Sequence, residues 1–96
     1  MTDDSKILAL TIQTLEDIKA TEITTLSVEN LTELMSYMVI ATATSKQHCR
    51  STAQHLVSVA KENQLNIIGV EGQDESEWVL VDLGGVVIHI MLEKTR

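Results

Sequence analysis

Residues 78–91 read WVLVDLGGVVIHIM, two apolar runs on either side of the pair Gly84-Gly85. Two such runs joined by a two-residue glycine loop predict a β-hairpin, and the short loop also fixes which residues face each other. The predicted cross-strand pairs are Leu83 with Val86, Asp82 with Val87, Val81 with Ile88, Leu80 with His89, Val79 with Ile90 and Trp78 with Met91. Because side chains alternate between the faces of a strand, the hairpin has two distinct surfaces.

The two surfaces of this hairpin differ in chemistry. One is purely aliphatic and is predicted to face the core: Val79, Val81, Leu83, Val86, Ile88 and Ile90. The other carries Trp78, Leu80, Asp82, Val87, His89 and Met91. This second surface is mostly apolar, yet it holds a carboxylate, an imidazole and the only tryptophan of the chain. We expect it to be either a packed face covered by a helix or a surface that binds another protein.

The composition limits the classes of protein to which the chain can belong. With 44% hydrophobic and 22% charged residues, the 96 residues are typical of one globular domain. The net charge is −7, and the seven basic residues are scattered, so a basic protein surface is a better expected partner than nucleic acid. Cys49 is the only cysteine, which fits a reducing compartment. No apolar run predicts a signal peptide or a membrane span, so we expect a cytoplasmic protein.

Hydrophobic periodicity predicts an alternation of helices and strands. The predicted elements are a helix over 5–19, strands over 23–28 and 36–42, a helix from 44 or 45 to 63, a strand over 66–70, and the hairpin. The run over 36–42 is almost continuously apolar, which is typical of a strand buried on both faces. The order predicts a single α/β domain, in which helices flank a mixed sheet of about five strands.

Capping residues and apolar stripes indicate where the two predicted helices begin and which faces they bury. Thr2, Asp3 and Asp4 are candidate caps of the first helix. Its apolar residues at helical spacing are Leu8, Ile12, Leu15 and Ile18. The second helix has an apolar stripe formed by Cys49, Ala53, Leu56, Val57 and Ala60.

The sequence holds no strong catalytic or metal-binding motif. His48 and His55 share a helix face, but zinc needs three or four converging ligands, so we expect no metal. Asp82 and His89 lie diagonally on the hairpin and are close enough to hydrogen-bond, although no nucleophile is placed to complete a triad. The turn over 41–45 opens a helix but lacks the glycines and lysine of a phosphate loop. We therefore predict a protein without catalytic activity or cofactor.

Five blocks in order along the chain point to a known family. They are residues 17–20 (DIKA), 37–45 (YMVIATATS), His48, 70–72 (VEG) and 78–91. With these blocks the chain resembles the ribosomal silencing factor family, also called iojap or YbeB. The resemblance implies a nucleotidyltransferase-like fold without catalytic carboxylates. It also implies binding to the large ribosomal subunit through its fourteenth protein, which blocks the small subunit and lowers translation during starvation or stationary phase.

The chain departs from the family pattern at several places. The family usually has aspartate at Gly85 and Ser36 and glycine at Ala43. Loss of the acid at Gly85 either removes a contact to a basic partner or eases the turn, since glycine suits positive φ. Ala43 indicates that its turn needs no positive φ. The family continues past this point, so residues 1–96 are expected to form one family-like domain without the C-terminal tail.

The resemblance and the hairpin surface together predict a partner-binding site. The family's binding surface is expected to include the sheet face that carries the tryptophan. The predicted binding residues are Trp78, Leu80, Asp82, Leu83, Val87, His89, Met91 and Glu77. Trp78, Leu80 and Met91 would form the apolar anchor, because hot spots favour aromatic side chains and methionine packs adaptably. Two alternatives remain: a nucleotide-binding protein derived from the nucleotidyltransferase-like fold, and a homodimeric adaptor.

Overall fold

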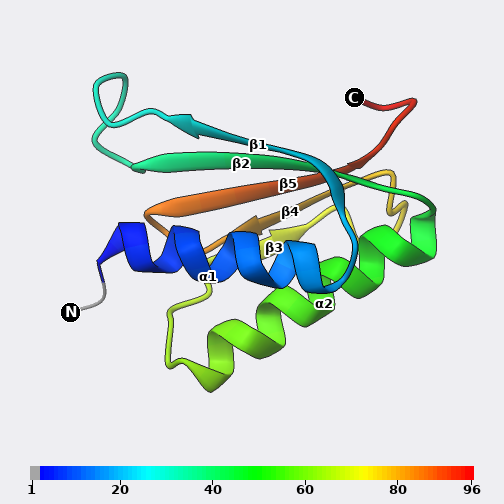
Figure 1. Ribbon diagram of the computed structural model, residues 1–96, viewed down its shortest axis with the longest axis horizontal. Coiled ribbons are helices and arrows are strands. Elements are labelled where there is room, and N and C mark those ends of the chain that lie inside the picture. Colours follow the sequence, from blue (N-terminus) through cyan, green and yellow to red (C-terminus); the bar gives the residue numbers. More distant parts are fainter. Residues whose placement is uncertain (1–2) are drawn as a thin grey trace.

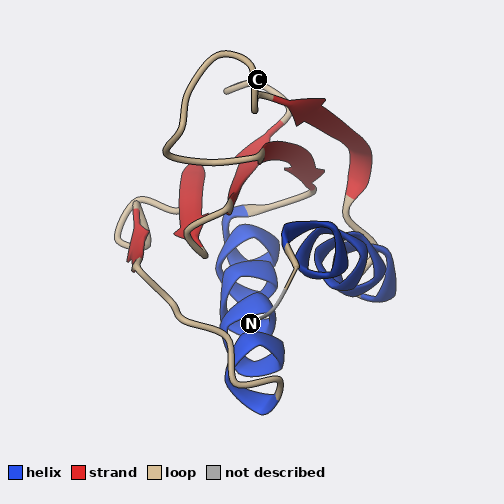
Figure 2. Cartoon of the chain, turned by 90° about the vertical axis from the view of Figure 1, so that its left-hand side faces the viewer, coloured by secondary structure: helices blue, strands red, loops and turns tan. Residues whose placement is uncertain are grey.

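The computed structural model describes residues 3–96 as two layers, a mixed sheet and two helices packed on one of its faces (Figures 1 and 2). The elements are α1 (Asp4–Asp17), β1 (Thr21–Ser27), β2 (Tyr37–Ala43), α2 (Lys46–Glu62), β3 (Gly69–Glu71), β4 (Trp78–Asp82) and β5 (Val86–Leu92). The strands lie in the order β1-β2-β5-β4-β3, with β2 and β5 parallel and the other neighbours antiparallel. The predicted α/β class and mixed five-stranded sheet are confirmed.

The hairpin of β4 and β5 has the predicted register. Asp82 pairs with Val87, and the pairing continues without a shift to Trp78 and Met91. The turn is closed by the amide of Leu83, which donates to the carbonyl of Val86 at 3.0 Å. Gly84 has φ +87°, a conformation that glycine adopts without strain. The two-residue loop was therefore sufficient to predict the pairing.

The core lies between the sheet and the helices. Every residue of the predicted aliphatic hairpin face is buried, and so is Cys49 on α2. The predicted stripe of α1 is partly wrong, because Ile7, Thr11, Thr14 and Leu15 are the buried residues while Leu8 and Ile12 are half-buried. Burial of Thr14 is tolerated because its hydroxyl donates to the carbonyl of Leu10 at 2.7 Å.

The helix caps follow from short polar side chains. Asp3 caps α1 by accepting from the amide of Ser5 at 3.0 Å, and Ser45 caps α2 by accepting from the amide of His48 at 3.0 Å. Thr2, the other candidate cap before α1, lies outside the described residues. Within 3–96, no helix is long and apolar enough to cross a membrane.

Two strand predictions need correction. The prediction that 36–42 is buried on both faces is wrong, because Met38 and Ile40 are only half-buried while Val39 and Ala41 are fully buried. Both helices lie on the side of Val39 and Ala41, so the other face has no helix over it. The strand predicted over 66–70 is shorter, Gly69–Glu71, because β4 ends at Asp82 and offers no partner further along.

The departures at Gly85 and Ser36 are explained together by a third residue. A Cβ on Gly85 would overlap the carboxylate of Asp4, at the start of α1. That carboxylate accepts a hydrogen bond of 2.6 Å from the hydroxyl of Ser36. The φ of Gly85 is not positive, so relief of the turn does not explain this glycine. Asp4 therefore occupies the space beside the hairpin tip that a side chain at position 85 would fill.

A candidate protein-binding face

The side of the sheet turned away from the helices is here called the open face. No helix of the described chain covers it, and Figure 2 shows α1 and α2 together on the opposite side. Of the two alternatives for the Trp78 side of the hairpin, a cover formed by a helix is therefore excluded for residues 3–96. Cross-strand pairing arranges the side chains of the open face in three rows. From the hairpin tip outward they are Leu26, Met38, Val87, Asp82 and Gly69; then Thr24, Ile40, His89, Leu80 and Glu71; then Thr42, Met91 and Trp78.

Trp78 is the most exposed large side chain of the hairpin, with 52% of its surface accessible. Its indole Nε1 donates to Nδ1 of His89 at 3.0 Å, and the two ring centroids are 5.8 Å apart. Since Nδ1 accepts this bond, the imidazole is neutral and carries its proton on Nε2. Burial lowers the pKa of His89 below its ordinary value of 6.5, which favours the same neutral form. The bond fixes the orientation of an otherwise exposed ring.

The predicted contact between Asp82 and His89 is not formed. One oxygen of Asp82 instead accepts from the amide of Gly84 at 2.8 Å, which stabilises the turn. His89 is engaged by Trp78. The two side chains share the open face, but they do not resemble a pair from a catalytic triad.

Glu77, predicted to supply charge at the rim, already has partners within the chain. Its Oε1 lies 3.0 Å from Nζ of Lys94 and 3.9 Å from Nζ of Lys46. The hydrogen bond and charge of Lys94 lower the pKa of Glu77. This exposed carboxylate is therefore ionised, but part of its charge is neutralised by neighbouring lysines.

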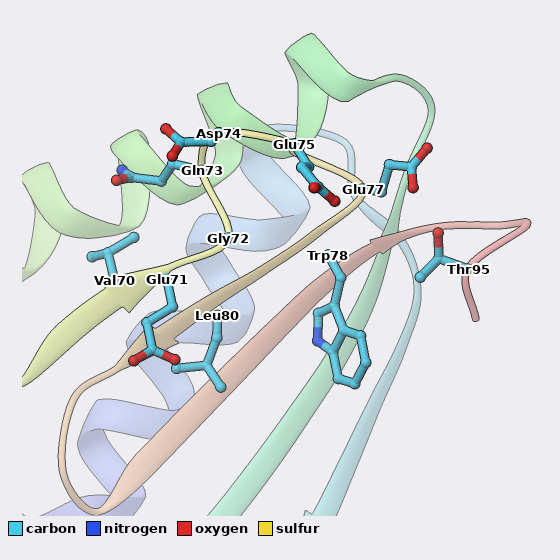
Figure 3. Close-up of a pocket in the computed structure, with 10 residues that line it drawn as sticks. All are labelled: Val70, Glu71, Gly72, Gln73, Asp74, Glu75, Glu77, Trp78, Leu80 and Thr95. Carbon is cyan, nitrogen blue, oxygen red and sulfur yellow. The ribbon is translucent and has the colours of Figure 1, made fainter.

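A broad groove runs beside Trp78, between β4 and the 72–77 loop (Figure 3). It encloses about 790 Å³ and is lined by Val70, Glu71, Gly72, Gln73, Asp74, Glu75, Glu77, Trp78, Leu80 and Thr95. The side chains of Glu71, Leu80 and Trp78 extend toward the same side of the sheet. The groove thus combines an apolar floor with several carboxylates at its edge, which suits an apolar partner surface that carries positive charge.

The remaining predicted binding residues are divided between the two sides of the sheet. Leu80 is half-buried on the open face, and Val87 and Met91 lie there with less than a tenth of their surface accessible. Leu83 is the exception, because it is buried among the core residues and does not lie on the open face. Sequence reasoning missed Met38, Ile40 and Leu26, which extend the open face onto β2 and β1. The apolar alternation of these strands was the available signal.

His48 has a structural role that sequence spacing did not reveal. Its Nδ1 accepts from the amide of Thr44 at 3.0 Å, so the proton lies on Nε2, 2.7 Å from the carbonyl oxygen of Ile18. The ring therefore joins the start of α2 to the end of α1. Within residues 3–96, no group of three His, Cys, Asp or Glu side chains is placed to hold a metal ion.

The fold and the open face define a small two-layer α/β domain with a surface suited to binding another protein. The chain matches the family described as "Ribosomal silencing factor during starvation" over residues 2–96, and it belongs to this family of ribosomal silencing factors. It is 41% identical over 91 residues to Ribosomal silencing factor RsfS of Chromobacterium violaceum, covering 95% of this chain and 75% of that protein.

Two further comparisons agree with the family. A crystal structure of a Chromobacterium violaceum protein superposes with a TM-score of 0.92 at 40% identity, covering 95% of this chain and 76% of that one. A mouse protein named "Mitochondrial assembly of ribosomal large subunit protein 1" is 36% identical over 63 residues, which cover 62% of this chain and 28% of that protein. The resemblance based on the five sequence blocks is therefore confirmed.

Proposed function

We propose that this ribosomal silencing factor binds the large ribosomal subunit with its open face and thereby blocks joining of the small subunit. The docking partner on the subunit would be its fourteenth protein, and the result would be lower translation in the cytoplasm during starvation or stationary phase. In this proposal the protein acts by occupying a surface and catalyses no reaction. The observation that carries the proposal is the open face itself, with Trp78 52% exposed at one end.

The chemistry of the open face supports a protein partner with positive charge. Trp78 and Leu80 provide accessible apolar surface, and Met91, the cross-strand partner of Trp78, lies beside them with 9% of its surface accessible. Aromatic side chains such as Trp78 are common binding hot spots. Glu71 and Asp82 add carboxylates on the same face. The net charge of −7 favours association with a basic surface and disfavours a direct grip on RNA phosphates.

The hydrogen bond to His89 supports Trp78 as the anchor. A side chain held in one orientation loses less conformational entropy when it is buried at an interface. The bond also satisfies the indole N–H, so burial under a partner leaves no unpaired donor. Trp78 is thus suited to be buried at an interface even though the free chain leaves it half exposed.

Co-sedimentation with purified large ribosomal subunits tests the proposal. Replacement of Trp78 by alanine is expected to weaken binding by at least about 2 kcal/mol, or roughly thirtyfold in the dissociation constant. His55→Ala is the matched control, because His55 is an exposed ring on α2, in the opposite layer. A folded Trp78→Ala protein that binds as tightly as the wild type would overturn the assignment of the open face.

The same exposed apolar surface favours one alternative, a homodimer that pairs through the open face. Sedimentation velocity with and without large subunits distinguishes the two. A dimer that persists on the subunit, or that forms while no subunit binding occurs, would favour the adaptor alternative.

A further inference from the structure

A second apolar surface lies at the hairpin-tip end of the open face, away from Trp78. Apart from Trp78, the large hydrophobic side chains that are exposed in residues 3–96 are Leu26, Leu31, Leu34 and Ile68. Leu26 belongs to the row nearest the tip, and Ile68 directly precedes Gly69 in that row. Leu31 and Leu34 are in the 28–36 loop that leads into β2. In Figure 1 this loop projects beyond the end of the sheet.

Of these exposed side chains, Ile68 lines a groove that is here called the tip groove. It encloses about 430 Å³ and is lined by Met35, Met38, Ile68, Gly69, Glu71, Leu80, Asp82, Val87 and His89. Met35 and Ile68 come from the segments just before β2 and β3, so they extend the lining beyond the paired strands. Gly69 leaves room at one wall, since a Cβ there would meet nothing within 4 Å. Methionine side chains adapt readily to the shape of a partner.

The charged residues around the tip groove indicate which charge a partner should carry. Glu71 and Asp82 are the acidic residues in its lining. His89 is the one lining residue that could carry a positive charge, and it is neutral because its Nδ1 accepts a hydrogen bond from Trp78. The sequence has no Lys, Arg or His between Lys19 and Lys46, a stretch that includes β1, the 28–36 loop and β2. The tip groove is therefore largely apolar, and the charged side chains in its lining, Glu71 and Asp82, are both acidic.

We propose that the tip groove takes an apolar, positively charged segment of the same ribosomal partner, so that the interface extends from the hairpin to the 28–36 loop. This inference rests on the proposed function. Apolar side chains of the partner would insert between Met35 and Ile68. Lysine or arginine side chains beside them would approach Glu71 and Asp82.

A second copy of this chain is a poorer occupant of the tip groove. A two-fold dimer brings the same patch of both copies together, so the carboxylates of Glu71 and Asp82 would face acidic surface. No lysine or arginine lines the groove to compensate them. Like charges facing each other across an interface oppose association, and the net charge of −7 adds to this effect.

The test uses Ile68→Ser and Glu71→Gln, measured as dissociation constants for purified large subunits and for the purified fourteenth protein. Ile68 is 65% exposed, so its replacement leaves the core intact, as circular dichroism and thermal unfolding would check. We expect Ile68→Ser to weaken binding about tenfold and Ile68→Val, the conservative control, to stay within about twofold of the wild type. Glu71→Gln should slow association and reduce the dependence of the association rate on salt. Glu16→Gln, at an exposed position of α1, should change neither the rate nor its salt dependence.

The outcomes separate this inference from the proposed function. If Trp78→Ala loses binding while Ile68→Ser and Glu71→Gln bind as the wild type does, the tip groove is not part of the interface and the inference fails alone. If the wild type binds neither probe, the proposed function fails and the inference with it. If Ile68→Ser changes a dimer into a monomer without altering ribosome binding, the tip groove belongs to a second copy and the inference is overturned.

Discussion

The indole Nε1 of Trp78 donates a hydrogen bond of 3.0 Å to Nδ1 of His89, diagonally across the two strands of the hairpin. This bond joins the most exposed large side chain of the hairpin to a half-buried imidazole. It requires that Nδ1 carry no proton. The orientation of Trp78 on the open face is therefore linked to the protonation state of His89.

The first prediction concerns pH. The pKa of His89 is lowered in the folded chain by burial, so below its ordinary value of 6.5 the unfolded chain takes up a proton first. The contribution of His89 to stability is then fully present above pH 6.5 and is lost as the pH falls toward the folded pKa. Urea unfolding between about pH 8 and about pH 5 should show a smaller loss of stability for His89→Gln than for the wild type. Equal losses in the two proteins would contradict the effect.

Tryptophan fluorescence reports on the same protonation of His89. Trp78 is the only tryptophan, so emission excited at the red edge of the spectrum, where Tyr37 does not absorb, reports on this residue alone. Protonation of His89 breaks the bond to Nε1 and places a cation beside the indole. Emission of the wild type should therefore change with pH below 6.5, while that of His89→Gln should stay flat over the same range. A titration of equal size in both proteins would assign the change to another group.

The pairing of Trp78 with His89 shows what the sequence could and could not predict. A two-residue loop determines the hairpin register, so the shared face and the diagonal positions were predictable. The hydrogen-bond partner of His89 was not predictable, because the backbone amide of Gly84 in the turn donates to Asp82 and so competes with His89 for this carboxylate. That competition depends on the local conformation of the turn, which the apolar pattern does not contain.

The open face was predictable for the hairpin but not for the rest of the sheet. An almost continuous apolar run predicts a strand buried on both faces, yet Met38 and Ile40 are half exposed. The apolar pattern of β2 is equally compatible with a covering helix and with a binding surface. Only the placement of both helices on one side distinguishes these two environments.

A second prediction concerns the turn that precedes Trp78. Gly72 has φ +86°, and a Cβ there would overlap the backbone oxygen of Trp78. Gly72→Ala is expected to cost about 2 kcal/mol or more of unfolding free energy, from strain and displaced backbone. Gly69→Ala is the matched control, since the added methyl group meets nothing within 4 Å and should change stability by less than about 0.5 kcal/mol. Urea unfolding measures both, and equal effects would count against the backbone contact.

A third prediction concerns the hairpin tip. Gly85→Asp should lower stability by about 1–2 kcal/mol, because the new side chain displaces Asp4 from Ser36 and adds a second carboxylate. The double substitution Asp4→Ala with Gly85→Asp removes the carboxylate of Asp4 and should recover part of the lost stability. A double-mutant cycle measured by chemical unfolding provides the coupling between the two sites. Strict additivity would show that Asp4 does not occupy the space of a side chain at position 85.

A fourth prediction tests the bridge between the helices. His48→Ala removes the bonds to Thr44 and Ile18 and should cost about 1–2 kcal/mol of unfolding free energy. His55→Ala, at an exposed position of the same helix, should stay within about 0.5 kcal/mol of the wild type. Thermal unfolding of the two variants side by side would measure the difference. A loss of equal size in both would remove the bridging role.

Blocking of the small subunit is measured most directly by a subunit-joining assay, in which purified large and small subunits are mixed after incubation of the large subunit with this protein. We expect the wild type to reduce the amount of joined ribosomes in a sucrose gradient in proportion to the occupied large subunits. Trp78→Ala should fail to do so at the same concentration, whereas His55→Ala should act like the wild type. Undiminished joining on large subunits that carry bound protein would show that this protein does not block the small subunit.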